Sequence, residues 1–228
     1  MSLRVVERLG LADVMTLANA TLGVVAMAAA VLGEVGLVAR LILLAAVADG
    51  LDGIIARSRG GTEVGPYLDS MADIVSFGTA PALFVFVAAN DAWGPLGQDL
   101  PLFALAAGVA SLFVVFSLVR TVLYTVYVGD GENRPGIQNT LASSIIAAAY
   151  LAGLTAVPAI LAATVVLSVL MVAPVPYPKL AARDALAMGV VQMGAILVPA
   201  ALSRLFPRAL LVAALAYLTL APRFYWED

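Results

Sequence analysis

Four aspartates in two short segments decide how this sequence is interpreted. The first segment reads ADGLDGIIAR over residues 48–57, and the second reads GPYLDSMAD over residues 65–73. Both lie in or beside long apolar stretches, where one ionised aspartate in a bilayer-buried helix costs at least about 2.5–3.5 kcal/mol. Four unpaired aspartates would therefore be too costly unless they bind something.

The spacing within each segment places its two aspartates on one face of a helix. Asp49 and Asp52 are separated by about one turn, and so are Asp69 and Asp73. Because the loop between the segments is short, the two helices are predicted to be antiparallel neighbours whose carboxylates face each other near one membrane surface. An all-oxygen site suits Mg²⁺ or Mn²⁺, with Ca²⁺ as an alternative occupant, and such cations would balance the charge.

The composition indicates an integral membrane protein. Of the 228 residues, 63% are hydrophobic and 12% are charged, and the mean hydropathy is +1.03. Ordinary globular proteins have about 45–50% apolar and about 25% charged residues. The chain has no histidine and no cysteine, which excludes histidine or thiolate catalysis, metal sites built on those residues, and disulfides. The 12 basic residues form no polybasic arm, so we expect no nucleic-acid partner.

Eight apolar stretches predict an all-α bundle of about eight transmembrane helices, since about 20 apolar residues cross a bilayer core. They cover residues 11–32, 37–56, 67–89, 102–128, 140–154, 159–175, 185–202 and 206–220. A signal peptide fits the first stretch poorly, because acidic residues lie among its basic ones and seven stretches follow. Residues 2–11 are expected to form an amphipathic lead-in on the membrane surface.

The basic residues of the short loops predict the orientation. If the N-terminus is cytoplasmic, eight basic residues lie on the cytoplasmic side and three on the other, which favours both termini inside. The eight are Arg4, Arg8, Arg57, Arg59, Arg134, Lys179, Arg183 and Arg223, and the three are Arg40, Arg204 and Arg208. The aspartate site is then expected at the cytoplasmic face of a multi-pass protein of the cell membrane.

The two segments resemble the signature of the CDP-alcohol phosphotransferase family, D-x-x-D-G-x-x-A-R followed after a spacer by G-x-x-x-D-x-x-x-D. The matching residues are Asp49, Asp52, Gly53, Ala56, Arg57, Gly65, Asp69 and Asp73. The spacer, residues 58–64, is one residue shorter than is usual in the family. The difference falls in the loop and leaves the spacing of both aspartate pairs intact.

The resemblance implies an enzyme that moves a phosphatidyl-type group from a CDP-activated membrane lipid to an alcohol and releases CMP. Two divalent metal ions would be held by the four aspartates, and Asp73 would act as the general base. Gly53 and Ala56 would make room for the nucleotide, although small residues in membrane helices also serve close helix packing. Arg57 would pair with a phosphate, and Gly65 belongs to the same CDP-lipid site. Family members are typically homodimers.

Further matches resemble the phosphatidylserine synthase branch, including the archaeal archaetidylserine synthases. They lie at residues 16–19, Gly23, residues 76–82, residues 170–178 and the ending at 222–226. The branch implies L-serine as the acceptor. No internal repeat or low-complexity linker divides the sequence, so we expect one domain over residues 1–228. The family resemblance implies a six-helix catalytic core at 11–175, with two appended helices at 176–228.

Three residues outside the signature are candidates for the active site or its surroundings. Arg120 is the candidate cation for the serine carboxylate, and the alternative is an arginine that extends to the membrane surface. Asn19 is predicted in the CDP-lipid site, whereas Thr16 is predicted to pack against a neighbouring helix. The polar stretch over residues 134–140 would close over the acceptor or form a loop and helix cap, and we favour the loop.

Other functions remain as alternatives. Glycerol 3-phosphate or inositol 1-phosphate would take the place of serine, but both are dianions that need more basic residues than the site offers. A cation-coupled transporter would also explain buried carboxylates, but it predicts charges at the bilayer midplane and related halves of the chain. A catalytically inactive scaffold is disfavoured because all four aspartates are present.

Overall fold

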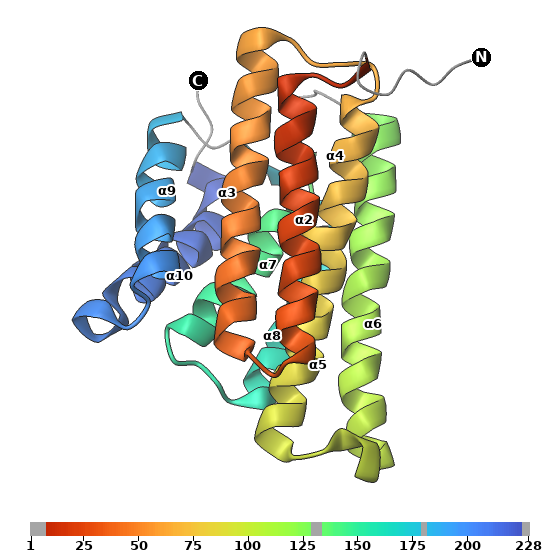
Figure 1. Ribbon diagram of the computed structural model, residues 1–228, viewed down its shortest axis with the longest axis vertical. Helices are drawn as coiled ribbons and strands as arrows, with labels where there is room; N and C mark the ends of the chain where they lie inside the picture. The colour runs from red at the N-terminus through yellow and green to blue at the C-terminus, as the bar shows by residue number, and fades with distance from the viewer. Residues whose placement is uncertain (1–7, 129–133, 179–181, 225–228) are drawn as a thin grey trace.

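The computed structural model describes residues 8–128, 134–178 and 182–224 (Figure 1). The helices are α2 (Leu11–Val31), α3 (Val35–Arg59), α4 (Gly65–Asp73), α5 (Ala80–Trp93), α6 (Leu100–Leu123), α7 (Asn139–Leu151), α8 (Val157–Met171), α9 (Ala182–Leu197) and α10 (Ala201–Phe224). Wider π-helical turns, η1 (Ile74–Thr79) and η3 (Tyr124–Val128), join α4 to α5 and extend α6, and a 3₁₀ turn, η2 (Leu96–Gln98), precedes α6. Counting α4, η1 and α5 as one rod, the described residues form eight helical segments, which confirms the predicted all-α bundle.

The helices form one bundle with a smaller helical pair at its side. Figure 1 shows α2, α3, the α4–α5 rod and α6 standing side by side, with α7 and α8 behind them. Helices α9 and α10 pack against each other and against α3 and α7. The α3–α4 loop lies at the same end of the bundle as the beginning of α2, so the two aspartate segments meet there.

Small residues allow α2 to approach its neighbours closely. Ala26, Ala29 and Ala30 are buried in the apolar core, where α2 packs extensively against α3. A side chain at Gly23 would place its Cβ 2.8 Å from the Cα of Ser76 in η1, so no larger residue fits there. Close backbone approach through small residues is the usual way in which membrane helices pack.

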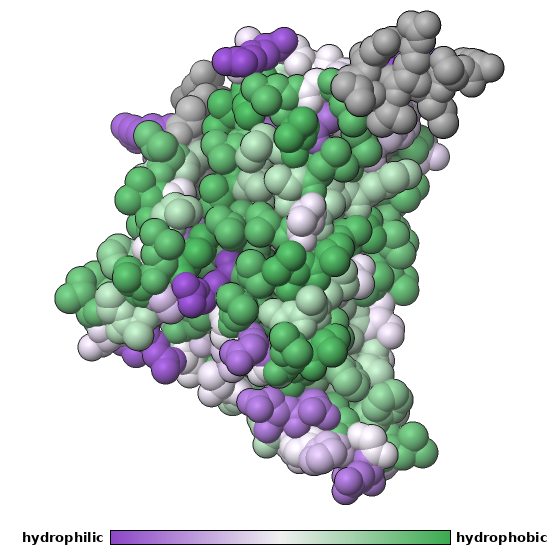
Figure 2. Space-filling view, viewed as in Figure 1, coloured by the Kyte–Doolittle hydropathy of each residue, from purple (hydrophilic) through white to green (hydrophobic). Residues whose placement is uncertain are grey.

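Four of the described helical segments are long and apolar enough to cross a membrane. They are α2, the rod over residues 65–93, residues 100–127 of α6 and η3, and α10. Helix α3 is long but carries charged residues, and α7, α8 and α9 have 13, 15 and 16 residues, fewer than the roughly 20 that a bilayer core requires. Figure 2 shows a largely hydrophobic surface, with polar residues at the two ends of the molecule and in smaller patches at its middle and lower left.

The polar stretch before α7 is attached to the end of α8. Arg134 and Pro135 (β1) pair with Pro176 and Tyr177 (β2), and the Ile137 N–H donates to the Leu170 carbonyl at 3.1 Å. The predicted loop thus includes a two-residue strand pair before Asn139 begins α7. Of the predicted surface lead-in over residues 2–11, residues 2–7 lie outside the described residues.

The beginning of α10 turns the chain sharply after α9. Leu202, Ser203 and Arg204 have φ of 49°, 56° and 64°, which is left-handed backbone, and right-handed helix follows. Pro207 then lies in the first regular turn, where proline is well tolerated. The break falls between the stretches predicted at 185–202 and 206–220.

Candidate active site

The structure brings three of the four aspartates together. Helix α3 carries Asp49 and Asp52, and the rod that begins at Gly65 carries Asp69 and Asp73. One carboxylate oxygen from each of Asp49, Asp69 and Asp73 lies within 4.8 Å of the other two. The two helices therefore present their acidic faces to each other, as the spacing predicts.

Asp52 lies outside this group of three, which differs from the predicted meeting of all four carboxylates, and it is hydrogen-bonded to α2. Its side chain is 7% exposed, and the Thr16 hydroxyl donates to Asp52 Oδ2 at 2.7 Å. Thr16 therefore contacts a neighbouring helix, as predicted, but its partner is one of the signature aspartates. A hydrogen bond to a charged group is about twice as strong as a neutral one, so this contact orients the Asp52 carboxylate.

A second contact from α2 holds the loop that precedes the other aspartate pair. Asp13 is 1% exposed, and its Oδ2 accepts from the Gly10 N–H at 2.7 Å and from the Thr62 hydroxyl at 2.8 Å. Thr62 Oγ1 in turn accepts from the Gly65 N–H at 3.0 Å. The short spacer over residues 58–64 is thereby tied to α2, and a Cβ on Gly65 would lie 3.2 Å from Asp13 Oδ1. The fit at this point leaves little room for a larger residue.

The role of Asp13 was not foreseen from the sequence. Asp13 lies near the beginning of the first predicted apolar stretch, 11–32, outside the signature motif. Its position supplies a usable signal, because Asp13, Thr16 and Asn19 follow one another at intervals of three residues and therefore lie along one face of a helix.

Asn19 is buried one turn beyond Thr16, with unused hydrogen-bonding capacity. Its side chain is 0% exposed, and neither Oδ1 nor Nδ2 has a hydrogen-bond partner among the described residues. Only its main-chain carbonyl is engaged, by the Ser76 hydroxyl at 2.8 Å. Leaving a buried polar group unpaired costs about 1–3 kcal/mol. Such a side chain is a reasonable place for a polar ligand group.

The outer part of α3, beside the aspartates, contains Gly53, Ala56 and Arg57. A Cβ on Gly53 would lie 3.2 Å from Arg57 Nη1, so the guanidinium folds back over Gly53. Arg57 is exposed, Gly53 and Ala56 are partly buried, and nothing lies within 4 Å of the position a Cβ would take on Gly50. Because these positions carry no side chain or only a methyl group, this face of α3 is open, with the Arg57 guanidinium beside it.

The α6 side of the site contains buried polar groups. Arg120 is 9% exposed, and its guanidinium carbon lies 4.6 Å from the centre of the Tyr124 ring, a cation–π contact. This burial contradicts the alternative of an arginine that extends to the membrane surface. The neighbouring Thr121 hydroxyl accepts from Asn139 Nδ2 at 2.7 Å, which joins α6 to the beginning of α7.

Helix α7 also reaches the aspartates. The Thr140 hydroxyl lies 3.4 Å from Asp49 Oδ2, within hydrogen-bonding distance but long. The end of the predicted polar stretch at 134–140 therefore borders the acidic group directly. This contact depends on the path of the chain between α6 and α7, which the residue pattern does not determine.

The donor set fits hard divalent cations. Three carboxylates converge from two helices, and Asp73 Oδ1 is buried without a hydrogen-bond partner among the described residues. Like charges held within 4.8 Å repel each other, and a bound cation would remove that repulsion while satisfying the open oxygen. Oxygen-only ligands suit Mg²⁺ or Mn²⁺.

Comparison with known proteins agrees with this site. The family model described as CDP-alcohol phosphatidyltransferase matches residues 9–176, which include every aspartate discussed above. A relative from Methanothermobacter thermautotrophicus, named archaetidylserine synthase, is 28% identical over 179 residues, covering 77% of this chain and 72% of the relative.

Two bacterial relatives match over shorter stretches. Proteins named CDP-diacylglycerol–serine O-phosphatidyltransferase, from Helicobacter pylori and Mycobacterium tuberculosis, are 32% and 38% identical over 87 and 96 residues. These alignments cover 38% and 40% of this chain, and 33% and 29% of the relatives. The similarity to these two proteins is thus confined to about a third of their length.

Proposed function

The chain belongs to the CDP-alcohol phosphatidyltransferase family and is a membrane enzyme of that class, and we propose that it transfers a phosphatidyl-type or archaetidyl group from a CDP-activated lipid to the hydroxyl of L-serine. The observation that carries the proposal is the convergence of Asp49, Asp69 and Asp73 where two apolar helices meet. The three relatives are named as synthases or transferases that act on serine, which supports the choice of acceptor.

The proposed reaction exchanges one phosphorus–oxygen bond for another. The serine hydroxyl oxygen attacks the lipid-bearing phosphorus of the diphosphate, and the bond from that phosphorus to the bridging oxygen breaks. CMP leaves with the bridging oxygen, and the hydroxyl proton passes to a carboxylate. Asp73 is proposed as this base, because a positioned carboxylate can accept the proton and its Oδ1 has no partner among the described residues.

The remaining signature residues are proposed to bind and orient the CDP-lipid. Asp49, Asp52, Asp69 and Asp73 would hold two divalent ions, Mg²⁺ or Mn²⁺, which when bound would offset charge on the diphosphate and on the leaving CMP. The Thr16 hydroxyl would keep the Asp52 carboxylate in position. Arg57 would pair with a phosphate beside the open face at Gly53 and Ala56, Gly65 would fix the beginning of α4, and Asn19 would contact a polar group of the lipid.

Arg120 is proposed to bind the carboxylate of serine. Its burial and its stacking on Tyr124 hold the guanidinium in one orientation on the α6 side of the site. A planar guanidinium can accept a carboxylate through two parallel hydrogen bonds. Phosphorylated acceptors such as glycerol 3-phosphate or inositol 1-phosphate would require additional cations near Arg120, so serine is preferred.

Orientation and assembly are part of the same proposal. The distribution of basic residues supports a cytoplasmic active site with both termini inside. The family match, which ends at residue 176, supports a catalytic core at 11–175 with two appended helices at 176–228. A homodimer is carried over from the family resemblance. A cation-coupled transporter is disfavoured, because the acidic group lies toward one end of the bundle.

Acceptor dependence tests the proposal. Purified protein in detergent would receive a CDP-lipid with Mn²⁺ or Mg²⁺, and CMP release would be measured with serine, glycerol 3-phosphate or inositol 1-phosphate added singly. We expect release that requires both serine and metal and that is lost in Asp73→Asn. Release with a phosphorylated acceptor instead would overturn the serine assignment, and no release with any of the three would overturn the transferase proposal.

A further inference from the structure

A cavity of about 190 Å³ lies where the core meets the appended helices. Its walls come from α3, α7, α9 and α10, with residues such as Ala46, Ser144, Met188 and Ala214. Neither the signature motif nor the reaction proposed above uses it. Helices α9 and α10 supply five of the twelve described residues that line it, although nothing in the sequence assigned these helices a chemical role.

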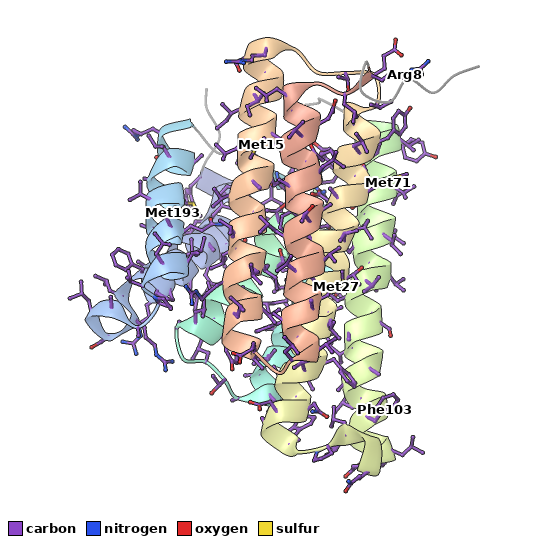
Figure 3. The ribbon with its side chains drawn as sticks, viewed as in Figure 1. Arg8, Met15, Met27, Met71, Phe103 and Met193 are labelled. Carbon is purple, nitrogen blue, oxygen red and sulfur yellow. The ribbon has the colours of Figure 1, made fainter. Side chains whose placement is uncertain are left out.

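The cavity begins next to the acidic group. Thr140 lines it and also contacts Asp49 at 3.4 Å, so one side chain borders both spaces. On α3, Ala46 precedes Asp49 by one helical turn and therefore lies farther from the aspartate end of the bundle. Figure 3 shows the same order along the bundle. Met15, the neighbour of Thr16 in α2, lies nearer the aspartate end than Met193, the neighbour of the cavity residue Gln192 in α9.

The chemistry of the walls favours an uncharged occupant. None of the described residues that line the cavity is charged. Three of the polar ones are engaged by main-chain carbonyls: Gln192 donates to Leu43 at 2.7 Å, Tyr177 to Leu218 at 3.2 Å, and Tyr217 to Pro178 at 2.5 Å. Placing the ammonium and carboxylate of serine there would leave both without a charged partner among the described lining residues. An uncharged, mainly apolar group fits instead.

We propose that this cavity binds the first part of one hydrocarbon chain of the CDP-activated lipid, with α9 and α10 forming the outer wall of the chain site. The inference rests on the proposed function, because it requires the diphosphate at the aspartates. A lipid held there has its polar end at Asp49 and its chain one turn deeper in the bilayer, where the cavity begins. The appended helices then determine which chains the enzyme accepts.

The test fills the cavity from α10, one of the two appended helices. Ala214→Leu on α10 places a larger side chain into it, and Ala216→Leu on the same helix adds the same volume outside its lining. KM and kcat would be measured for a long-chain CDP-lipid and for a water-soluble analogue whose chains are acetyl groups. We expect Ala214→Leu to raise the KM of the long-chain lipid about tenfold, the effect of leaving about two methylene groups unburied.

The KM values for serine and for the acetyl analogue should stay unchanged, and Ala216→Leu should behave as wild type. Equal KM for the long-chain lipid in both variants would overturn the inference, as would a rise in the KM of serine alone. A higher thermal midpoint with unchanged kinetics would mean that the cavity is only a packing void. If Ala214→Leu does not fold, Ser144→Leu fills the same space from α7. Failure of the proposed function itself would be distinguishable, since wild type would then release no CMP from either lipid.

Discussion

The aspartate end of the core and the appended helices differ in the hydrogen bonds that their polar side chains make between helices. At the aspartate end, side chains bond to side chains, as in Thr16 to Asp52 and Thr62 to Asp13. Where α9 meets the core, side chains bond to main-chain carbonyls, as in Gln192 to Leu43 and Arg40 to Ile196 at 2.6 Å. The first arrangement depends on the identity of both partners, whereas the second needs only one donor. Substitutions at the aspartate end should therefore alter catalysis more than equal changes elsewhere.

The largest effect is expected from Asp69→Asn. The change keeps the shape of the side chain but removes one of three negative charges held within 4.8 Å. Loss of a metal-binding carboxylate should lower CMP release by about 10²–10⁴-fold, the range usually seen for a positioned acid–base or metal group. Activity and bound Mn²⁺, measured by electron paramagnetic resonance, should fall together.

Asp91→Asn is the matched control for this prediction. Asp91 is exposed near the end of α5, away from the aspartate group, so its loss should leave both activity and bound metal at wild-type levels. Equal losses in the two variants would mean that the acidic group at the α3–α4 junction has no special role. The comparison between the two regions would then have no chemical basis.

A second, smaller effect is expected from substitution of Arg120, and it should appear in the KM for serine. Arg120→Gln removes the cation proposed to bind the serine carboxylate, so the KM for serine should rise about 10–100-fold, the usual cost of losing a charge-assisted pair. Arg120→Lys should recover only part of this loss, because an ammonium cannot form two parallel hydrogen bonds. Initial rates at varied serine and at varied CDP-lipid separate the two substrates. A rise only in the KM of the lipid would place Arg120 in the lipid site instead.

The bond from Thr16 to Asp52 should contribute less. Thr16→Val preserves shape and removes the Thr16 donor from a buried carboxylate, so we expect a loss of about 1.5–3 kcal/mol in stability and about a tenfold fall in kcat. Thr21→Val on the same helix is the control, because the Thr21 hydroxyl is exposed and bonds only to the Leu17 carbonyl of its own helix. Thermal unfolding and CMP release of the two variants would be compared. Similar behaviour of the two would show that the Asp52 contact is incidental.

The sequence predicted well those features that follow from helix length and helix periodicity. The eight helical segments follow the apolar stretches, and Asp49 meets Asp69 and Asp73 because spacings of three and four residues repeat with the helical turn. It predicted poorly those features that depend on loop path and helix rotation. Asp13 reaches Thr62 only because the short spacer folds over the beginning of α2, and Thr140 reaches Asp49 only through the placement of α7.

Features that depend on several weak constraints together were also missed. The cavity beside α9 and α10 forms because four helices leave space at one place. No sequence motif predicts such a cavity. Asp52 lies outside the group formed by the other three aspartates, and its carboxylate accepts a hydrogen bond from Thr16 of α2. These are packing outcomes, and they vary with small rotations of the helices that leave the residue pattern unchanged.

The smallest effect is expected at the beginning of α10, where a substitution should raise stability slightly and leave activity unchanged. Ser203 is exposed and has φ of 56°, and left-handed backbone costs a non-glycine residue about 1–2 kcal/mol. Ser203→Gly removes this strain but gives the unfolded chain more freedom, which offsets about 0.4–1 kcal/mol. The net gain should be about 0.5 kcal/mol, a rise of about 1–2 °C in the thermal midpoint, with unchanged CMP release. Ser203→Ala keeps the strain and should show no gain. A fall in activity in Ser203→Gly would instead mean that the rigid turn between α9 and α10 supports catalysis, which would bring the appended helices closer in character to the aspartate end.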